Sequence, residues 1–93
     1  MEFIWLFNGE MGRFASGAFR ERKLAEDWIR THQLTGILTK YPINVGVYDW
    51  AVKEGIFNVK KEEHRTSSFI GRFTSAAQEH YHYVNGEIDG SDQ

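Results

Sequence analysis

The stretch LTGILTKYPINVGVYDWAVKEG, residues 34–55, organises this chain because its hydrophobic period changes partway. Residues 37–41 alternate in the way that is typical of a β-strand. Pro42, the only proline, lacks a backbone N–H and should end the strand pairing. Beyond it the spacing becomes helical, with Asn44 as the expected cap and Gly55 at the expected left-handed end. The stretch therefore predicts a strand that leads into a short helix.

The residues before this stretch predict a hairpin. The run FIWLF, residues 3–7, is apolar at every position, which favours an inner strand with both faces covered. Asn8-Gly9 is a strong turn signal, and residues 14–19 then predict a second strand. We expect the two strands to pair antiparallel.

A helix is predicted over residues 21–32. Its apolar residues fall at helical spacing, and Glu26 and Arg30 stand four positions apart in the favoured order for an ion pair. Trp28 is expected in the core, since aromatic residues at this spacing usually pack inward. The predicted apolar stripe consists of Leu24, Ala25, Trp28 and Ile29.

The C-terminal half predicts less regular structure. The mixed-charge run 60–65 is typical of a solvated loop, and Thr66 with the two serines after it can start one helical turn. Residues 78–84 predict a last strand, which Asn85-Gly86 should close.

The predicted fold class is α+β: a small sheet of about four strands, one amphipathic helix packed on it and a second short helix. Residues 1–88 should form a single domain, and residues 89–93, which carry no apolar side chains, a disordered C-terminal tail. The predicted core consists of Phe3, Trp5, Phe7, Phe19, Leu24, Trp28, Ile29, Ile37, Val47 and Ala51.

Composition excludes several classes of function. The 11 basic and 13 acidic residues give a net charge of −2, too balanced for a nucleic-acid surface. Without cysteine the chain has neither disulfides nor thiolate chemistry. The apolar run at residues 3–7 is far shorter than the roughly 20 residues that span a bilayer, and it follows no basic signal-peptide region. We expect a cytoplasmic protein without membrane contact, nucleic-acid partner or cofactor.

The segment EHYHY, residues 79–83, is one candidate site. On a strand His80 and His82 share one face and the two tyrosines the other. The pair is consistent with an exposed edge, with a polar binding surface, or with a metal site completed by His64, Glu62 or Glu63. It lacks a third ligand of its own, so no metal site is predicted.

A second candidate lies in the organising stretch. Asp49 suits the first turn of a helix electrostatically, and it can also hydrogen-bond a partner protein beside Tyr48. Aromatic bodies with polar tips are typical of binding hot spots. We therefore expect one binding patch in which His80 or His82 lies beside Tyr48 or Asp49. The predicted binding residues are Tyr41, Tyr48, Asp49, His80 and His82.

The chain also resembles a known family in several segments. They are FNGE (7–10), SGAF (16–19), AEDWI (25–29), LTGILTKYP (34–42), VGVYDWA (45–51), FIGRF (69–73) and EHYHY (79–83). Together they resemble a family of small bacterial proteins described as a domain of unknown function. The resemblance implies a single domain and supplies no catalytic residues. It also implies a Ser or Thr before the first helix, where this chain has Phe19-Arg20-Glu21.

Two functions follow from these patterns. The first is a non-enzymatic domain that binds another protein, as immunity proteins and inhibitors do. The alternative is a small metal-dependent or acid–base enzyme centred on His80 and His82. No Ser/His/Asp order or phosphate-binding glycine pattern supports catalysis, so binding is preferred.

Overall fold

The computed structural model describes residues 1–90 and has an α+β fold built on one antiparallel sheet. The strand order is β2-β1-β3-β4-β5, which puts β3 in the middle. The strands are β1 (Phe3–Gly9), β2 (Gly17–Phe19), β3 (Gly36–Pro42), β4 (His80–Val84) and β5 (Glu87–Ile88). The helices are α1 (Arg22–Thr31), α2 (Val47–Lys53), the 3-10 turn η1 (Glu62–Arg65) and α3 (Ser67–Gly71).

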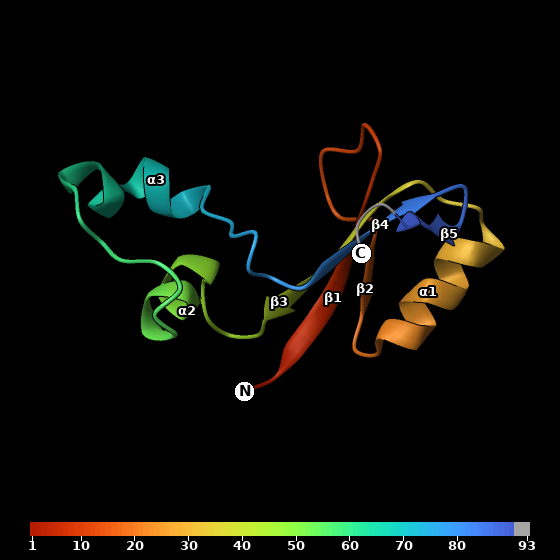
Figure 1. Ribbon diagram of the computed structural model, residues 1–93, viewed down its shortest axis with the longest axis horizontal. Coiled ribbons are helices and arrows are strands. Elements are labelled where there is room, and N and C mark those ends of the chain that lie inside the picture. The colour runs from red at the N-terminus through yellow and green to blue at the C-terminus, as the bar shows by residue number, and fades with distance from the viewer. Residues whose placement is uncertain (91–93) are drawn as a thin grey trace.

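Helix α1 covers one face of this sheet and forms the main core with it (Figure 1). Phe7 lies opposite Leu38, and Leu38 lies opposite Tyr81, so alternate residues of three strands point to the helix. The buried members of this core are Trp5, Phe7, Ala25, Ile29, Leu38 and Tyr83. Burial of these large side chains supplies the main driving force for folding.

The predicted α+β class is confirmed, but the element count was too low. The sheet gains β5 after the Asn85-Gly86 turn, where both residues have positive φ. The chain also forms α3, whose cap Thr66 accepts a hydrogen bond from the backbone N–H of Phe69. Helix α2 begins after Gly46, and Asn44 turns the chain at φ 67° instead of capping it.

Helix α1 is close to its predicted bounds, and its start at Arg22 has no side-chain cap. Its ion pairs differ from the predicted Glu26–Arg30 pair. Glu26 bonds Arg22, one turn earlier, and Arg30 bonds Asp27. The i,i+4 spacing allowed either arginine as a partner of Glu26, which also accepts a hydrogen bond from Tyr83 of the sheet.

Two predicted core residues are exposed. Leu24 is 55% exposed because the helix turns Ala25 and Ile29 to the sheet, and Ile37 is 39% exposed because it points away from α1. Tyr83 takes a place in the core that the sequence pattern did not assign. The prediction that both faces of β1 are covered was also wrong, since Ile4 and Leu6 are only partly buried.

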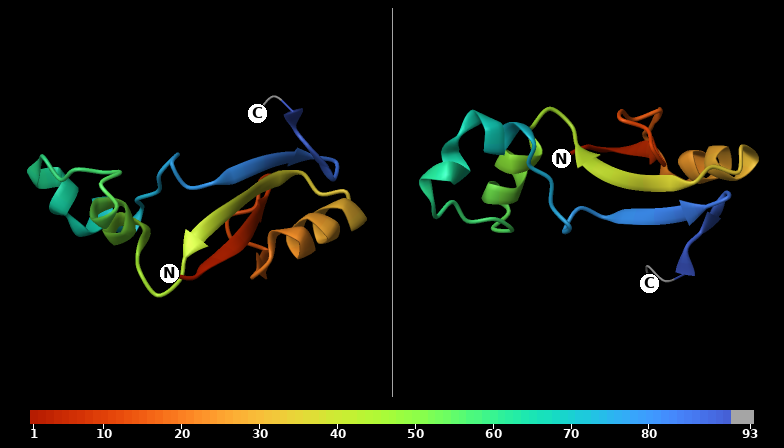
Figure 2. Two further views of the ribbon diagram at one scale, coloured as in Figure 1. Left: turned by 60° about the horizontal axis from the view of Figure 1, so that its bottom comes forward. Right: turned by 90° about the horizontal axis from the view of Figure 1, so that it is seen from above.

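The segment between β3 and β4 forms a second, smaller cluster at one end of the sheet, away from α1 (Figure 2). Phe57 packs against Phe69 and Phe73 with ring centroids 5.7 and 4.9 Å apart. We call this set the aromatic cluster; it consists of Tyr48, Phe57, His64, Phe69 and Phe73. The molecule is consequently elongated, measuring 44 × 27 × 24 Å.

Asp89, the first residue of the predicted tail, donates its N–H to the carbonyl of His82, and residues 91–93 lie outside the described part. Among residues 1–90, every helix is too short or too polar to cross a bilayer.

Candidate binding surface on the open face of the sheet

Within the described residues 1–90, no helix covers the sheet face opposite α1. In the view from above in Figure 2, no helix passes in front of β3 and β4. The pairs Ile4–Tyr41, Leu6–Thr39 and Ile37–His82 place the side chains of three strands on this face. We use the name open face for its central residues, with Glu87 of the edge strand β5 lying at its border opposite Val84. These central residues are Ile4, Leu6, Ile37, Thr39, Tyr41, His80 and His82.

Burial differs sharply between the two faces of the same strands. Leu38 is fully buried under α1, whereas its neighbour Ile37 is exposed. Every residue of the open face is exposed or only partly buried. The open face therefore presents aliphatic side chains, one phenol and two imidazoles to solvent.

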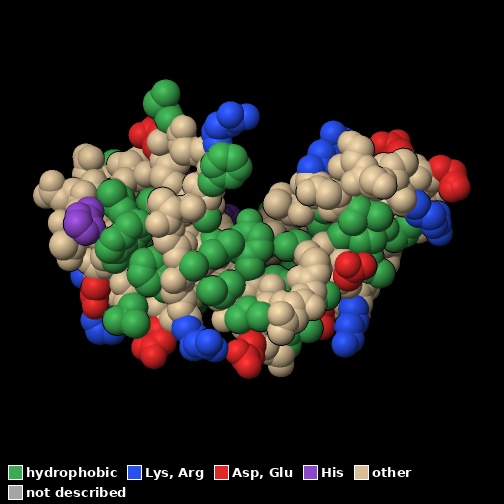
Figure 3. Space-filling model, turned by 180° about the vertical axis from the view of Figure 1, so that it is seen from behind, with side chains coloured by type: hydrophobic (Ala, Val, Ile, Leu, Met, Phe, Trp, Pro, Cys, Tyr) green, Lys and Arg blue, Asp and Glu red, His purple; other side chains and the backbone are tan. Residues whose placement is uncertain are grey.

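Two adjoining cavities turn the open face into a trough. One, of about 310 Å³, is lined by Thr39, Tyr41, His80 and the segment 74–76 that leads into β4. The other, of about 440 Å³, lies beside the loop after β1. Both cavities are lined in part by Ile37 and His82, so they lie next to each other. Figure 3 shows the molecule hollowed between its two parts, with hydrophobic side chains at the floor.

The loop between β1 and β2 stands at one side of this trough and exposes large apolar side chains. Met11 is 97% exposed and Phe14 is 79% exposed. Met11 lines the larger cavity together with Ile37. Isolated exposed apolar residues are common, but an exposed pair beside an apolar hollow is typical of interaction surfaces. The sequence predicted a loop only up to residue 13 and placed Phe14 in a strand over residues 14–19. That strand was predicted too long, since β2 begins at Gly17 and leaves Phe14 in the exposed loop.

His80 is held in one orientation at the floor of the trough. Its Nδ1 lies 2.7 Å from the carbonyl oxygen of Gln78, and because a carbonyl only accepts, Nδ1 carries the proton. Nε2 is then the ring nitrogen left for a further hydrogen bond. The rings of His80 and His82 are 5.8 Å apart.

The third ligand considered for these histidines lies elsewhere. His64 belongs to the aromatic cluster, where its Nδ1 accepts backbone N–H groups of Lys60 and Lys61. Within residues 1–90, no group of three or more His, Asp or Glu side chains is arranged to hold a metal ion.

The five predicted binding residues fall into two groups. Tyr41, His80 and His82 line the same cavity. Tyr48 and Asp49 lie on α2 and are not among its lining residues; the ring of Tyr48 packs on Phe69 and Phe73. The trough takes its second wall instead from Thr74, Ser75 and Ala76, whose sequence carries no functional signal.

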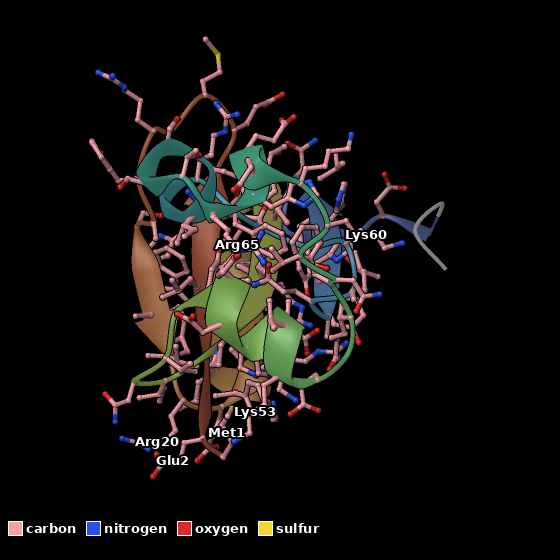
Figure 4. The ribbon with its side chains drawn as sticks, turned by 90° about the vertical axis from the view of Figure 1, so that its left-hand side faces the viewer. Met1, Glu2, Arg20, Lys53, Lys60 and Arg65 are labelled. Atoms are coloured by element: carbon pink, nitrogen blue, oxygen red, sulfur yellow. The ribbon has the colours of Figure 1, made fainter. Side chains whose placement is uncertain are left out.

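Charged side chains lie mainly off the open face. Figure 4 shows Lys53, Lys60 and Arg65 at the end of the molecule formed by the aromatic cluster, and Arg20 beside Glu2, with which it forms a 3.0 Å ion pair. None of the seven residues of the open face is Asp, Glu, Lys or Arg. This neutrality distinguishes the open face from the α1 side.

The α1 side carries a polar network instead. The hydroxyl of Tyr83 donates to Glu26 at 2.7 Å, and Arg22 holds the same carboxylate at 3.1 Å. Burial, followed by the hydrogen bond to Glu26, raises the pKa of Tyr83 above that of a free tyrosine. Next to it, Tyr81 donates to Glu79 and lies under the Arg22 guanidinium, 3.8 Å from the ring centroid. The hydrogen bond to Glu79, with burial as the next cause, raises the pKa of Tyr81.

The fold and the trough define a two-layer α+β domain with one helix-covered and one open sheet face. The chain belongs to the family described as "Domain of unknown function (DUF7710)", whose model matches residues 4–89. The predicted resemblance to a domain of unknown function is confirmed to that extent, and the bacterial origin stays a prediction. No curated protein and no solved structure matches the chain.

Proposed function

We propose that this chain is a non-enzymatic protein-binding domain, of the kind to which immunity proteins and inhibitors belong, and that the open face is its binding surface. The observation that supports this is the burial pattern of β3, in which Leu38 is fully buried and Ile37 and Tyr41 face the trough. The proposal keeps the expected cytoplasmic location, because the chain has no cysteine for the disulfides of small secreted domains.

The chemistry of the open face suits a protein partner. Burying apolar area contributes about 25 cal/mol per Å², so covering Ile4, Leu6 and Ile37 is favourable. Tyr41 and His80 add polar tips that fix orientation, since a partner group can form a hydrogen bond with Nε2 of His80. A bound protein would thus gain affinity from the apolar side chains and a fixed orientation from the polar ones.

Site-specific photo-crosslinking tests the proposal. A benzoylphenylalanine placed at Thr39, in the middle of the open face, should form a covalent protein adduct on irradiation in cells. The same group at Leu24, on the solvent side of α1, is the matched control and should form none. The double variant Ile37→Asp/Tyr41→Ala should abolish the adduct without changing the circular dichroism spectrum.

A result with no adduct from position 39, or with equal adducts from positions 39 and 24, would overturn the proposal. So would an adduct that persists in the folded double variant, because the apolar and aromatic contacts would then not matter.

A further inference from the structure

Features of the chain itself indicate which protein binds the open face. This inference rests on the proposed function. We propose that the protein covering the open face is a second copy of this chain, in a two-fold dimer in which each copy seats its β1–β2 loop in the trough of the other. The loop concerned spans residues 10–16 and carries Met11 and Phe14 at its exposed positions.

The surface area of this elongated molecule is large enough for an interface of standard size. The chain exposes 6538 Å², whereas a monomer of 10.8 kDa typically exposes about 5,500 Å². The excess follows from the elongated shape, and the exposed surface can supply the roughly 800 Å² that each partner hides in a standard interface. The radius of gyration, 14.6 Å, likewise exceeds the value of about 12 Å expected for this length.

Self-complementarity is the reason to choose a second copy. A two-fold interface brings the same surface patch from both subunits together, so a contact from residue i to residue j occurs twice. This chain carries both halves of such a contact: a protruding apolar loop and, beside it, an apolar trough. Figure 1 shows the loop rising from the sheet on the side away from α1, so that a facing copy can receive it.

The charge distribution of the open face and the loop also favours a second copy of this chain as the partner. Because like charges meet their own copies near a two-fold axis, an interface of this kind should have a neutral centre, and the seven residues of the open face include no charged side chain, while Glu87 lies on the edge strand β5. The loop also carries Arg13, while Glu10 and Asp89 line the loop end of the trough. A reciprocal exchange of loops brings this basic residue toward acidic groups of the other copy.

Light scattering coupled to size exclusion tests the dimer on the purified full chain. At about 100 µM, a concentration that populates interfaces of micromolar affinity, the wild type should have twice the chain mass of 10.8 kDa. Thr39→Glu places a charge in the trough and Phe14→Lys places one on the loop, and each should be a monomer. Leu24→Glu, on the solvent side of α1, is the matched control and should stay a dimer.

Mixing the two charged variants tests the exchange itself. In a mixed dimer, the trough of the Thr39→Glu copy receives the loop of the Phe14→Lys copy, so the two introduced charges are opposite in sign and attract. The second loop–trough contact of that dimer is unaltered. The equimolar mixture should therefore recover the dimer mass although neither variant dimerises alone. Circular dichroism of each variant confirms that it is folded, and Thr39→Lys replaces Thr39→Glu, mixed with Phe14→Glu, where folding fails.

Several outcomes would overturn the inference. They are a wild type that stays at 10.8 kDa at this concentration, folded variants that remain dimers, or a mixture that stays monomeric. Failure of the dimer can be distinguished from failure of the proposed function. If the wild type is a monomer but the crosslinker at Thr39 captures a different protein in cells, the dimer is wrong and the binding function stands; if it captures nothing, both are wrong.

Discussion

Tyr83→Phe is the change that tests the polar network under α1 most directly. It removes one hydroxyl, which donates to the Glu26 carboxylate at 2.7 Å, and leaves the buried ring in place. Hydrogen bonds to charged groups contribute about 1.5–3 kcal/mol. Glu26 keeps Arg22 as a partner and is 27% exposed, so water can reach it and the low end applies.

We expect a loss of about 1.5 kcal/mol in the free energy of unfolding, measured by urea denaturation. For a domain of this length that corresponds to a fall of about 6–12 °C in Tm. Tyr81→Phe is the matched control, because its hydroxyl bonds the more exposed Glu79. Its loss should be at most about 0.5 kcal/mol.

The same variant predicts a dependence on alkaline pH. The pKa of Tyr83 is raised in the folded chain, so the folded state holds this proton at a pH where the unfolded state, with a pKa of about 10, has released it. The contribution is therefore complete below pH of about 10 and is lost as pH rises further. The stability difference between wild type and Tyr83→Phe should shrink above that pH. A Tyr83→Phe variant as stable as Tyr81→Phe, or a difference that grows with pH, would refute this reasoning.

Three further predictions concern the core, the sheet and the histidines. Trp28→Ala should cost about 3 kcal/mol by urea denaturation, the low end for a truncated Trp, because Trp28 is only partly buried although it packs on Phe7 and Phe19; an unchanged melt would show that these ring contacts do not stabilise the fold. Gly36→Ala should lower Tm and cost about 2 kcal/mol or more, since a Cβ there would overlap the carbonyl oxygen of Asn8 in the neighbouring strand, while Gly71→Ala, with open space around it, should be neutral. The purified protein should hold no stoichiometric zinc, nickel or iron, and a chelator should leave Tm unchanged; about one metal ion per chain by elemental analysis, lost in the His80→Ala/His82→Ala variant, would favour the enzyme alternative.

Local signals predicted the regular elements well. The alternation of residues 37–41 and the proline after them give β3, which ends at Pro42. Helix α1 follows from apolar spacing alone, and Thr66 starts α3 as its side chain predicted. Gly55 has the positive φ, 75°, expected at the end of the short helix. These features depend on neighbours in sequence, which is why a single sequence is sufficient.

The choice of sheet face could not be predicted in the same way. In β3 both alternating sets contain apolar residues, so the pattern cannot tell that Leu38 meets α1 and Ile37 does not. The burial of Tyr83 was likewise not predicted, because it packs in a core whose residues lie far away in sequence, and its hydroxyl bonds Glu26, 57 positions away. The short strand β5 lies between the predicted turn at Asn85-Gly86 and the predicted tail, in two residues for which the sequence predicted no element.

The candidate site was predicted only in part, because its residues come from segments that lie far apart in the sequence. Alternation placed His80 and His82 on one face, and strand pairing brings that face beside Tyr41. Tyr48 was linked to them only by composition. Its ring joins the aromatic cluster, which forms from residues spread between 48 and 73.

The long connection between β3 and β4 has a consequence for how this family varies. It leaves the sheet after Pro42 and returns at Glu79, whose carbonyl accepts the N–H of Lys40, so the two strands meet as a hairpin would. The side chain of Gln78 also bonds the Lys40 carbonyl and fixes the returning strand. The register of the sheet is thus set at the base of the connection, and segments of different length can replace α2 and α3 without shifting it. Length variation among family members should therefore concentrate between residues 43 and 77, while the sheet and α1 keep a constant size.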